Sequence, residues 1–313
     1  MSDAKMVVPP KKINEALNWC ESVLGAHRGE SELLVTEAYR RASGRELTRL
    51  EIYLNPTTEL STEATGILLN FAEERVAGKP IQYIVGHQQF LEHRYIVRPG
   101  VLIPRPETEA LVAKAIRVLR AMPVEPRLGL EVGLGSGAIS IEILCAFPRL
   151  LMLASELSAA ALECGSENAK RILKEGAGRL SMLPVRDPSQ VLDVFSQPLQ
   201  ERKADFLITN PPYLRNSSDE VDGSVLDSEP AEALFPYNGD PLHFYREIAE
   251  AGRNCLEVGG WIFAEIAHER VREVSRLFVT RSWDVQIQPD LTGRDRILMA
   301  RLMKAAPSEF GRN

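Results

Sequence analysis

The sequence predicts an α/β protein: a doubly wound, mostly parallel seven-stranded sheet with one reversed strand, preceded by a small helical bundle and a β-hairpin linker. Three observations lead to this prediction. Apolar residues recur at helical spacing through residues 12–76, strand-like and helical segments alternate from residue 128, and no helix fits between the last two strand-like segments. Since 313 residues exceed the usual size of one domain, we expect three parts, at 1–76, 77–105 and 106–313.

The N-terminal part carries the apolar stripes of amphipathic helices. One stripe consists of Ile13, Ala16, Leu17, Cys20 and Leu24. Another follows Ser61, a suitable N-cap, and consists of Ala64, Ile67, Leu68 and Phe71. Shorter helices are expected between them at 33–41 and 47–54. We therefore predict a small bundle, which by itself indicates no function.

A hairpin and a helix are expected to connect the bundle to the sheet. Residues 81–103 alternate in polarity and are rich in Tyr, Ile, Val and Phe, which predicts one or two hairpin strands. Pro104-Arg105-Pro106 then leads into a predicted helix. Its first turn holds Glu107, Thr108 and Glu109, where acidic side chains suit the helix dipole.

The C-terminal part contains seven predicted strands. Their ranges are 128–132, 150–155, 180–185, 206–209, 260–266, 283–288 and 297–302. Helical stretches separate the first five strands, which predicts parallel pairing, whereas the last two are expected to pair antiparallel.

Composition and charge weigh against several classes of function. The net charge is −6 and no long basic run occurs, which is atypical of a large nucleic-acid interface. The four cysteines form no CxxC pair and the five histidines no HExxH motif, so we expect buried free thiols and no bound metal. No apolar run is long enough for a bilayer and residues 1–10 lack a signal-peptide core, so a cytoplasmic protein without membrane contact is expected.

A glycine-rich loop follows the first predicted strand of the sheet. It reads Glu131-Val132-Gly133-Leu134-Gly135-Ser136-Gly137, and its GxGxG spacing differs from the GxGxxG of dinucleotide sites. Glycine lets a ligand approach the backbone closely. Because Glu131 can pair with an ammonium group, the pattern suits a nucleoside that carries an amino acid. Glu156, after the second strand, either accepts hydrogen bonds from ribose hydroxyls or is a solvated loop acid.

The motif Asn210-Pro211-Pro212-Tyr213 follows the fourth predicted strand, whose carboxyl end faces the ligand crevice of such a sheet. Two prolines fix the backbone and remove two N–H donors, so the turn presents carbonyl oxygens and the Asn210 side chain. The Asn210 oxygen and the Pro211 carbonyl can accept the two N–H donors of an amide or exocyclic amine, and Tyr213 can pack against its plane. Such a grip would hold the nitrogen in line with the methyl group of a sulfonium.

With these motifs the sequence resembles the HemK/PrmC family, whose members methylate the N5 nitrogen of a glutamine in peptide chain release factors. The resemblance spans nearly the whole chain. Besides the glycine loop, Glu156 and the 210–213 motif, it rests on Pro80, Tyr83, Gly86, Phe90, the run Val101-Leu102-Ile103-Pro104-Arg105-Pro106-Glu107-Thr108-Glu109, Glu229-Pro230, Ala233-Leu234 and Gly293-Arg294-Asp295-Arg296. The NPPY motif alone also occurs in enzymes that methylate adenine or guanine. Its combination with the 101–109 run and the bundle indicates release factors.

The resemblance implies a class I methyltransferase domain that uses S-adenosyl-L-methionine, with residues 1–76 as a domain that helps to grip a release factor. The target would be the glutamine of the GGQ loop. The implied cofactor contacts are Glu131, Gly133, Leu134, Gly135, Ser136, Gly137, Glu156, Asp187, Pro188 and Asn210. The implied substrate contacts are Leu102, Arg105, Asn210, Pro211, Pro212 and Tyr213, of which the last four form the catalytic motif.

Several positions depart from the common family pattern. Leu134 stands where Thr is common, whereas Glu131 and Glu156 replace Asp and keep its charge. The segment Arg186-Asp187-Pro188 lacks the aromatic residue or Leu that commonly follows the acid. Three charged residues near this turn are Arg105, Glu107 and Glu109. They either contribute to the site or fix the turn into the helix.

Three other functions are compatible with parts of the pattern. A methyltransferase acting on a nucleic-acid base, or on a glutamine of another protein, would use the same NPPY grip, although the former should carry a basic recognition region. A binding module could retain the cofactor site without catalysis, and the presence of Asn210 argues against it. A dehydrogenase would need the GxGxxG spacing and a hydride-relay residue, which we do not find in the sequence.

Overall fold

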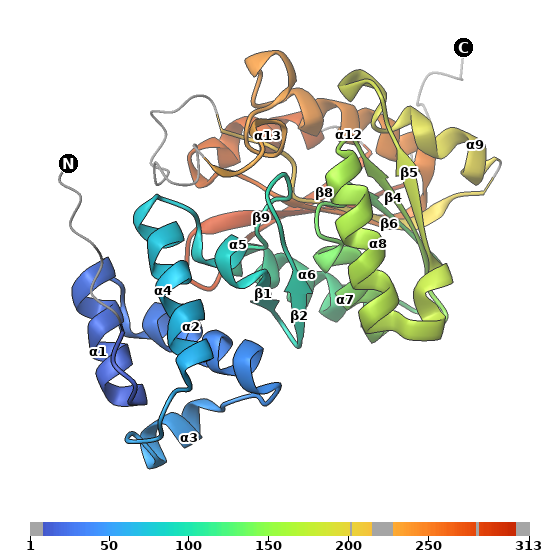
Figure 1. Ribbon diagram of the computed structural model, residues 1–313. Coiled ribbons are helices and arrows are strands. Elements are labelled where there is room, and N and C mark those ends of the chain that lie inside the picture. The colour runs from blue at the N-terminus through green and yellow to red at the C-terminus, as the bar shows by residue number, and fades with distance from the viewer. Residues whose placement is uncertain (1–8, 201, 215–227, 280–281, 305–313) are drawn as a thin grey trace, which may run out of the picture. The chain divides into compact units, whose positions relative to one another are not determined.

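The computed structural model describes residues 9–200, 202–214, 228–279 and 282–304. The chain divides between His87 and Gln88 into two compact units (Figure 1). One hydrophobic core lies in the N-terminal unit and two lie in the C-terminal unit. No helix in these described ranges is long and apolar enough to cross a membrane.

The N-terminal unit has five helices within its described residues, 9–87. They are α1 (Ile13–Leu24), α2 (Arg28–Ser43), α3 (Arg49–Leu54), α4 (Thr62–Val76) and α5 (Ile81–Val85). The predicted apolar stripes are buried on α1 and α4, and the Ser61 hydroxyl accepts a hydrogen bond from the Ala64 N–H at 3.1 Å as the N-cap of α4. The predicted helical bundle is therefore confirmed.

The strand prediction for residues 81–103 is wrong at both ends. Residues 81–85 form α5, because Pro80 starts the helix, Gly86 ends it in the left-handed conformation, and Ile81, Ile84 and Val85 pack into the core of the bundle. Only β1 (His87–Phe90) and β2 (His93–Ile96) form the hairpin. Residues 97–105 run to the next helix without regular secondary structure.

The C-terminal unit contains the predicted seven-stranded sheet. Its strands are β3 (Leu128–Val132), β4 (Leu151–Glu156), β5 (Leu180–Pro184), β6 (Ala204–Thr209), β7 (Leu256–Glu265), β8 (Trp283–Pro289) and β9 (Asp295–Leu302). The order is β5-β4-β3-β6-β7-β9-β8, and β9 is antiparallel to both of its neighbours. The reversed strand thus lies second from the edge, because the connection from β7 through α13 leaves a gap that β9 fills.

Helices cover both faces of this sheet, as the predicted doubly wound fold requires. The helices α6 (Pro106–Arg120), α7 (Ala138–Ala146) and α8 (Ala159–Leu173) contribute to one apolar core. The helices α9 (Ser196–Leu199), α12 (His243–Cys255) and α13 (Val271–Phe278) contribute to the other core, and Figure 1 shows α12 and α13 across the sheet from α7 and α8.

The register of the parallel strands brings separate motifs to one edge of the sheet. Val132 of β3 is paired with Ser155 of β4 and with Thr209 of β6. The residues that follow these three positions are the glycine loop, Glu156 and Asn210. The carboxyl ends of the strands therefore place three motifs far apart in sequence around one crevice.

Candidate active site

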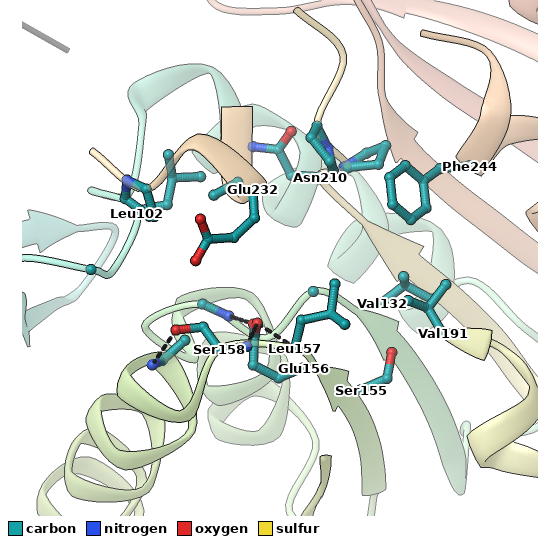
Figure 2. Close-up of a pocket in the computed structure, with 18 residues that line it drawn as sticks. Leu102, Val132, Ser155, Glu156, Leu157, Ser158, Val191, Asn210, Glu232 and Phe244 are labelled. Atoms are coloured by element: carbon teal, nitrogen blue, oxygen red, sulfur yellow. Dashed lines mark hydrogen bonds between the residues drawn. The ribbon is translucent and has the colours of Figure 1, made fainter. Parts of the chain in front are cut away.

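A cavity opens at the carboxyl ends of β3, β4 and β6 (Figure 2). Seven of the residues expected at the site line it: Leu102, Gly133, Gly135, Glu156, Asn210, Pro211 and Pro212. Its other lining residues are Gly100, Val132, Ser155, Leu157, Ser158, Ala161, Val191, Pro230, Glu232, Ala233 and Phe244. The structure thus brings the glycine loop, the acid at the end of β4 and the NPPY motif to a single cavity.

The glycine loop exposes its backbone to this cavity. Gly133 and Gly135 have positive φ angles of 80° and 57°, which L side chains rarely adopt. A Cβ atom added at either glycine would meet no other atom within 4 Å, so free space lies above the loop. The amides of Gly133 and Leu134 both donate to the Ser155 carbonyl, at 3.0 and 3.1 Å, which ties the loop to β4.

Glu156 fastens the loop from the other side. Its Oε2 accepts a hydrogen bond from the Gly135 amide at 2.8 Å. Its Oε1 accepts from the amides of Leu157 and Ser158 at 2.8 and 2.9 Å. Since a carboxylate offers about four lone-pair sites, three backbone donors leave roughly one site for a ligand hydroxyl. The carboxylate is therefore held in place by the backbone before any ligand arrives.

Three other loop residues do not line the cavity. The Leu134 side chain is buried in the core, where a Cβ atom added at Gly165 would come within 2.8 Å of its Cδ2. Ser136 is buried and its carbonyl accepts from Asn168 at 2.9 Å. Gly137 caps α7 with a φ of 82°. The leucine that departs from the family pattern thus serves packing between the loop and α8.

Asp187 and Pro188, expected near the cofactor, also lie outside the cavity lining. The Oδ1 atom of Asp187 accepts from the amide and the hydroxyl of Ser189, at 2.9 and 2.8 Å, and these bonds lower the pKa of Asp187. Pro188 begins a 3₁₀ turn that ends at Gln190. In this stretch of the chain the residue that reaches the cavity is Val191.

Glu131 is fully buried beneath the glycine loop and does not line the cavity. Its Oε2 accepts from the Ser140 hydroxyl of α7, while its Oε1 has no hydrogen-bond partner in the described part of the chain. Burial raises the pKa of Glu131 from 4.5 to about 8, against the opposing effect of the Ser140 hydrogen bond. The side chain therefore retains its proton at neutral pH in the folded protein.

This raised pKa predicts a pH-dependent stability. Between the ordinary pKa of 4.5 and about 8, the unfolded chain releases the Glu131 proton and the folded chain keeps it, so stability falls as pH rises. We expect wild type to lose about 2 kcal/mol more than Glu131→Gln between about pH 6 and pH 8, as measured by urea unfolding. Subtracting the variant's free energy of unfolding at each pH removes the contribution of the other titrating groups. If the two proteins showed the same dependence on pH, the assignment would be contradicted.

The NPPY turn presents an amide side chain at the cavity. Asn210, Pro211 and Pro212 line it, and Asn210 lies across the cavity from Glu156 in Figure 2. The Asn210 Nδ2 donates to the Thr108 hydroxyl at 3.0 Å. Tyr213 is not among the lining residues, and its hydroxyl donates to Glu265 at 3.0 Å. The structure therefore places Tyr213 behind the cavity wall.

Arg105 does not line the cavity, but it is paired with a residue that supports the cavity wall. Its guanidinium is paired with the buried carboxylate of Glu229, which also accepts from the Ile103 amide at 3.0 Å. Glu229 thereby fastens the loop that carries Leu102 to the segment that begins at Pro230. Glu109 has a comparable function, because it accepts from the Leu91 amide of the hairpin at 3.1 Å. Both contacts favour the interpretation that these charges fix the turn.

Four lining residues beyond the NPPY motif were not predicted as site residues: Pro230, Glu232, Ala233 and Phe244. The first three belong to or adjoin the Glu229-Pro230 and Ala233-Leu234 pairs of the resemblance, so that segment carried the information although no role had been assigned to it. The Glu232 carboxylate points into the cavity in Figure 2. Phe244 lies on α12, and no local pattern in the sequence marks it.

The fold and this cavity define the class of protein. A sheet of this order with a reversed strand beside the edge, a GxGxG loop after β3 and an acid at the end of β4 form a class I S-adenosylmethionine-dependent methyltransferase fold. In the part of the chain that the structure describes, no group of His, Cys, Asp and Glu side chains could hold a metal ion.

Comparisons with known proteins identify the family. Residues 15–86 match the model of the PrmC N-terminal domain. The chain is 35% identical to a release factor glutamine methyltransferase of Bacteroides thetaiotaomicron over 254 residues, covering 80% of this chain and 86% of that protein. It is 30% identical to the Enterococcus faecalis release factor glutamine methyltransferase over 299 residues, covering 93% and 99%. A solved release-factor-specific protein-(glutamine-N5) methyltransferase of Alicyclobacillus acidocaldarius is 27% identical, with a TM-score of 0.40 over 67% of this chain and 100% of that chain.

The chain therefore belongs to the HemK/PrmC family of release factor glutamine methyltransferases, which are S-adenosylmethionine-dependent protein-glutamine methyltransferases. The resemblance inferred from the motifs is confirmed.

Proposed function

We propose that this protein transfers a methyl group from S-adenosyl-L-methionine to the side-chain amide nitrogen of the glutamine in the GGQ loop of a peptide chain release factor. One observation carries the proposal: Asn210 and the carbonyl-bearing Pro211 line the same cavity as Gly133, Gly135 and Glu156. The cofactor loop and the amide-binding turn thus face one space. We also propose that the protein acts in the cytoplasm and that a release factor is its partner.

The residues of the cavity fit this cofactor. The free space above Gly133 and Gly135 allows a ligand to approach the backbone, and Glu156 retains an acceptor site for a ribose hydroxyl. Val132, Val191 and other apolar side chains line the cavity and suit a purine ring. When bound, S-adenosyl-L-methionine supplies a methyl group on a positively charged sulfur, and transfer forms a C–N bond as the C–S bond breaks.

Glu156 provides the test of cofactor binding. Glu156→Ala removes the hydroxyl acceptor and the tether of the Gly135 amide, so we expect S-adenosyl-L-methionine to bind more weakly by about 1–3 kcal/mol. Isothermal titration calorimetry measures this change. Glu163→Ala is the matched control, because it removes the same charge from an exposed position on the neighbouring helix α8. Equal affinities of the two variants would reject the assignment.

The protein's own residues act on the target amide by positioning and by accepting hydrogen bonds. An amide nitrogen is a poor nucleophile, because its lone pair is delocalised into the carbonyl. The Asn210 oxygen and the Pro211 carbonyl can accept its two N–H groups, and both interactions strengthen as positive charge develops on the nitrogen. The nitrogen then releases one proton to water and becomes a neutral secondary amide.

The proposal is tested with purified release factor and methyl-labelled cofactor. We expect the label on a peptide that contains the GGQ glutamine, located by tandem mass spectrometry. Replacement of that glutamine in the release factor should remove the label. Labelling of RNA or DNA in place of the release factor would overturn the proposal, as would labelling of a different residue.

A further inference from the structure

The cavity amide is connected to a buried carboxylate behind it. Asn210 Nδ2 donates to Thr108 Oγ1 at 3.0 Å, and Thr108 Oγ1 donates to Glu265 Oε2 at 2.6 Å. Thr108 lies in the first turn of α6 and Glu265 ends β7, so three elements meet in one hydrogen-bonded chain. Thr108 and Glu265 are 5% and 1% exposed, which shields the chain from water.

The other oxygen of Glu265 is also occupied. Tyr213 donates its hydroxyl proton to Glu265 Oε1 at 3.0 Å, and burial raises the pKa of Tyr213 well above its ordinary value, so this proton is retained. Burial raises the pKa of Glu265, whereas hydrogen bonds from Thr108 and Tyr213 and the charge of Arg296 oppose that rise. Both oxygens of Glu265 therefore act as hydrogen-bond acceptors, each for one hydroxyl donor.

This arrangement fixes the direction of each hydrogen bond. A threonine hydroxyl has a single proton, and Thr108 gives it to Glu265. The Thr108 oxygen can then only accept from Asn210, which must turn its NH₂ group towards Thr108. The Asn210 Oδ1 forms no hydrogen bond within the described ranges and is left to accept a proton donor in the cavity.

We propose that Thr108, held by Glu265, is a positioning residue that sets the orientation of the Asn210 amide and so makes the cavity select a group that donates N–H. This inference rests on the proposed function and deepens it. A rotated Asn210 would present its NH₂ to the substrate NH₂, and two donors cannot form a hydrogen bond. The same rotation would remove the oxygen that stabilises positive charge on the substrate nitrogen.

We call the hydrogen-bonded chain from Asn210 through Thr108 to Glu265 the relay, and substitution of Thr108 tests it. Thr108→Val keeps the shape of the side chain and removes the hydroxyl, so Asn210 loses its fixed orientation. We expect kcat for methyl transfer to fall by about 10- to 100-fold, with little change in KM or in cofactor affinity. Thr108→Ser restores the hydroxyl and should restore most of kcat. Retention of kcat within about twofold in Thr108→Val would overturn the proposal.

A neighbouring threonine supplies the matched control. Thr209 is fully buried at the end of β6, and its hydroxyl donates its proton to the Val132 carbonyl at 2.8 Å, not to a member of the Asn210–Thr108–Glu265 chain. Thr209→Val therefore removes a buried hydroxyl beside the site while leaving the relay intact. We expect its kcat to stay near that of wild type. An equal loss of kcat in Thr209→Val and Thr108→Val would overturn the proposal by showing a general effect of lost packing or stability.

A second measurement does not depend on activity. In protein labelled with ¹⁵N-asparagine, the side-chain NH₂ signals of Asn210 are assigned by their absence in Asn210→Ala. We expect these signals to shift and to exchange faster with water in Thr108→Val, and to return in Thr108→Ser. Unchanged Asn210 signals in Thr108→Val would overturn the relay. A wild-type protein that shows the relay but labels no release factor would refute the proposed substrate alone.

Discussion

Substitution of Asn210 by alanine is expected to lower kcat for glutamine methylation by about 100- to 1000-fold while the affinity for S-adenosyl-L-methionine stays near that of wild type. The side-chain oxygen of Asn210 is one of two acceptors that the NPPY turn offers to the substrate nitrogen. Its contribution is greatest when the methyl group arrives and the nitrogen becomes positive, so the loss appears in kcat more than in KM. Single-turnover methylation with labelled cofactor measures it.

The separation of the two effects is what makes this substitution informative. Glu156 lies on the opposite wall, and its replacement by alanine is expected to weaken cofactor binding. The two alanine variants therefore separate cofactor affinity from turnover. If Asn210→Ala also failed to bind the cofactor in calorimetry, Asn210 would be part of the cofactor site. If its turnover remained normal, the nitrogen would be held by other residues.

The sequence predicted the sheet and the cavity because both depend on local patterns. The GxGxG loop needs glycine at positive φ, and the NPPY turn needs proline after a buried strand. Each motif can therefore be identified from a few consecutive residues. Parallel pairing then brings the ends of β3, β4 and β6 together, because strands connected by helices share one direction.

The sequence did not reveal what lies behind the cavity. Leu134 looked like a loop residue beside a ligand, and only the packing of α8 shows that its side chain enters the core. The bond from Thr108 to Glu265 spans 157 positions of the chain. No spacing rule predicts such a contact, since it depends on where α6 crosses the end of β7. Residues that act through another side chain therefore escape a search for motifs.

The helix α5 shows that a local pattern can also predict the wrong secondary structure. Residues 81–85 are apolar and β-branched enough to resemble a strand, but Pro80 and Gly86 enclose a single helical turn that the core of the bundle stabilises. Periodicity cannot distinguish strand from helix over five residues. Tertiary packing decides the outcome at such a length.

Removal of residues 1–86 is expected to lower kcat/KM for an intact release factor by about 100-fold, because we propose that the helical unit supplies a second contact with the substrate. When two contacts share one chain, the second forms at a high effective concentration, and its removal weakens binding without any change at the cavity. Cofactor affinity should be retained, since all the described residues that line the cavity lie between positions 100 and 244. Among the described residues, the cores on both faces of the sheet contain none before Phe90, so the shortened chain keeps them whole.

A short peptide that contains the GGQ sequence provides the control, because it occupies the cavity alone. We expect the full-length and shortened proteins to methylate the peptide at similar rates and to differ only on the intact release factor. Circular dichroism and thermal unfolding verify that the shortened protein is folded. An equal loss on peptide and protein would show that the helical unit maintains the catalytic unit, and equal activity on the intact release factor would show that recognition resides in residues 87–313.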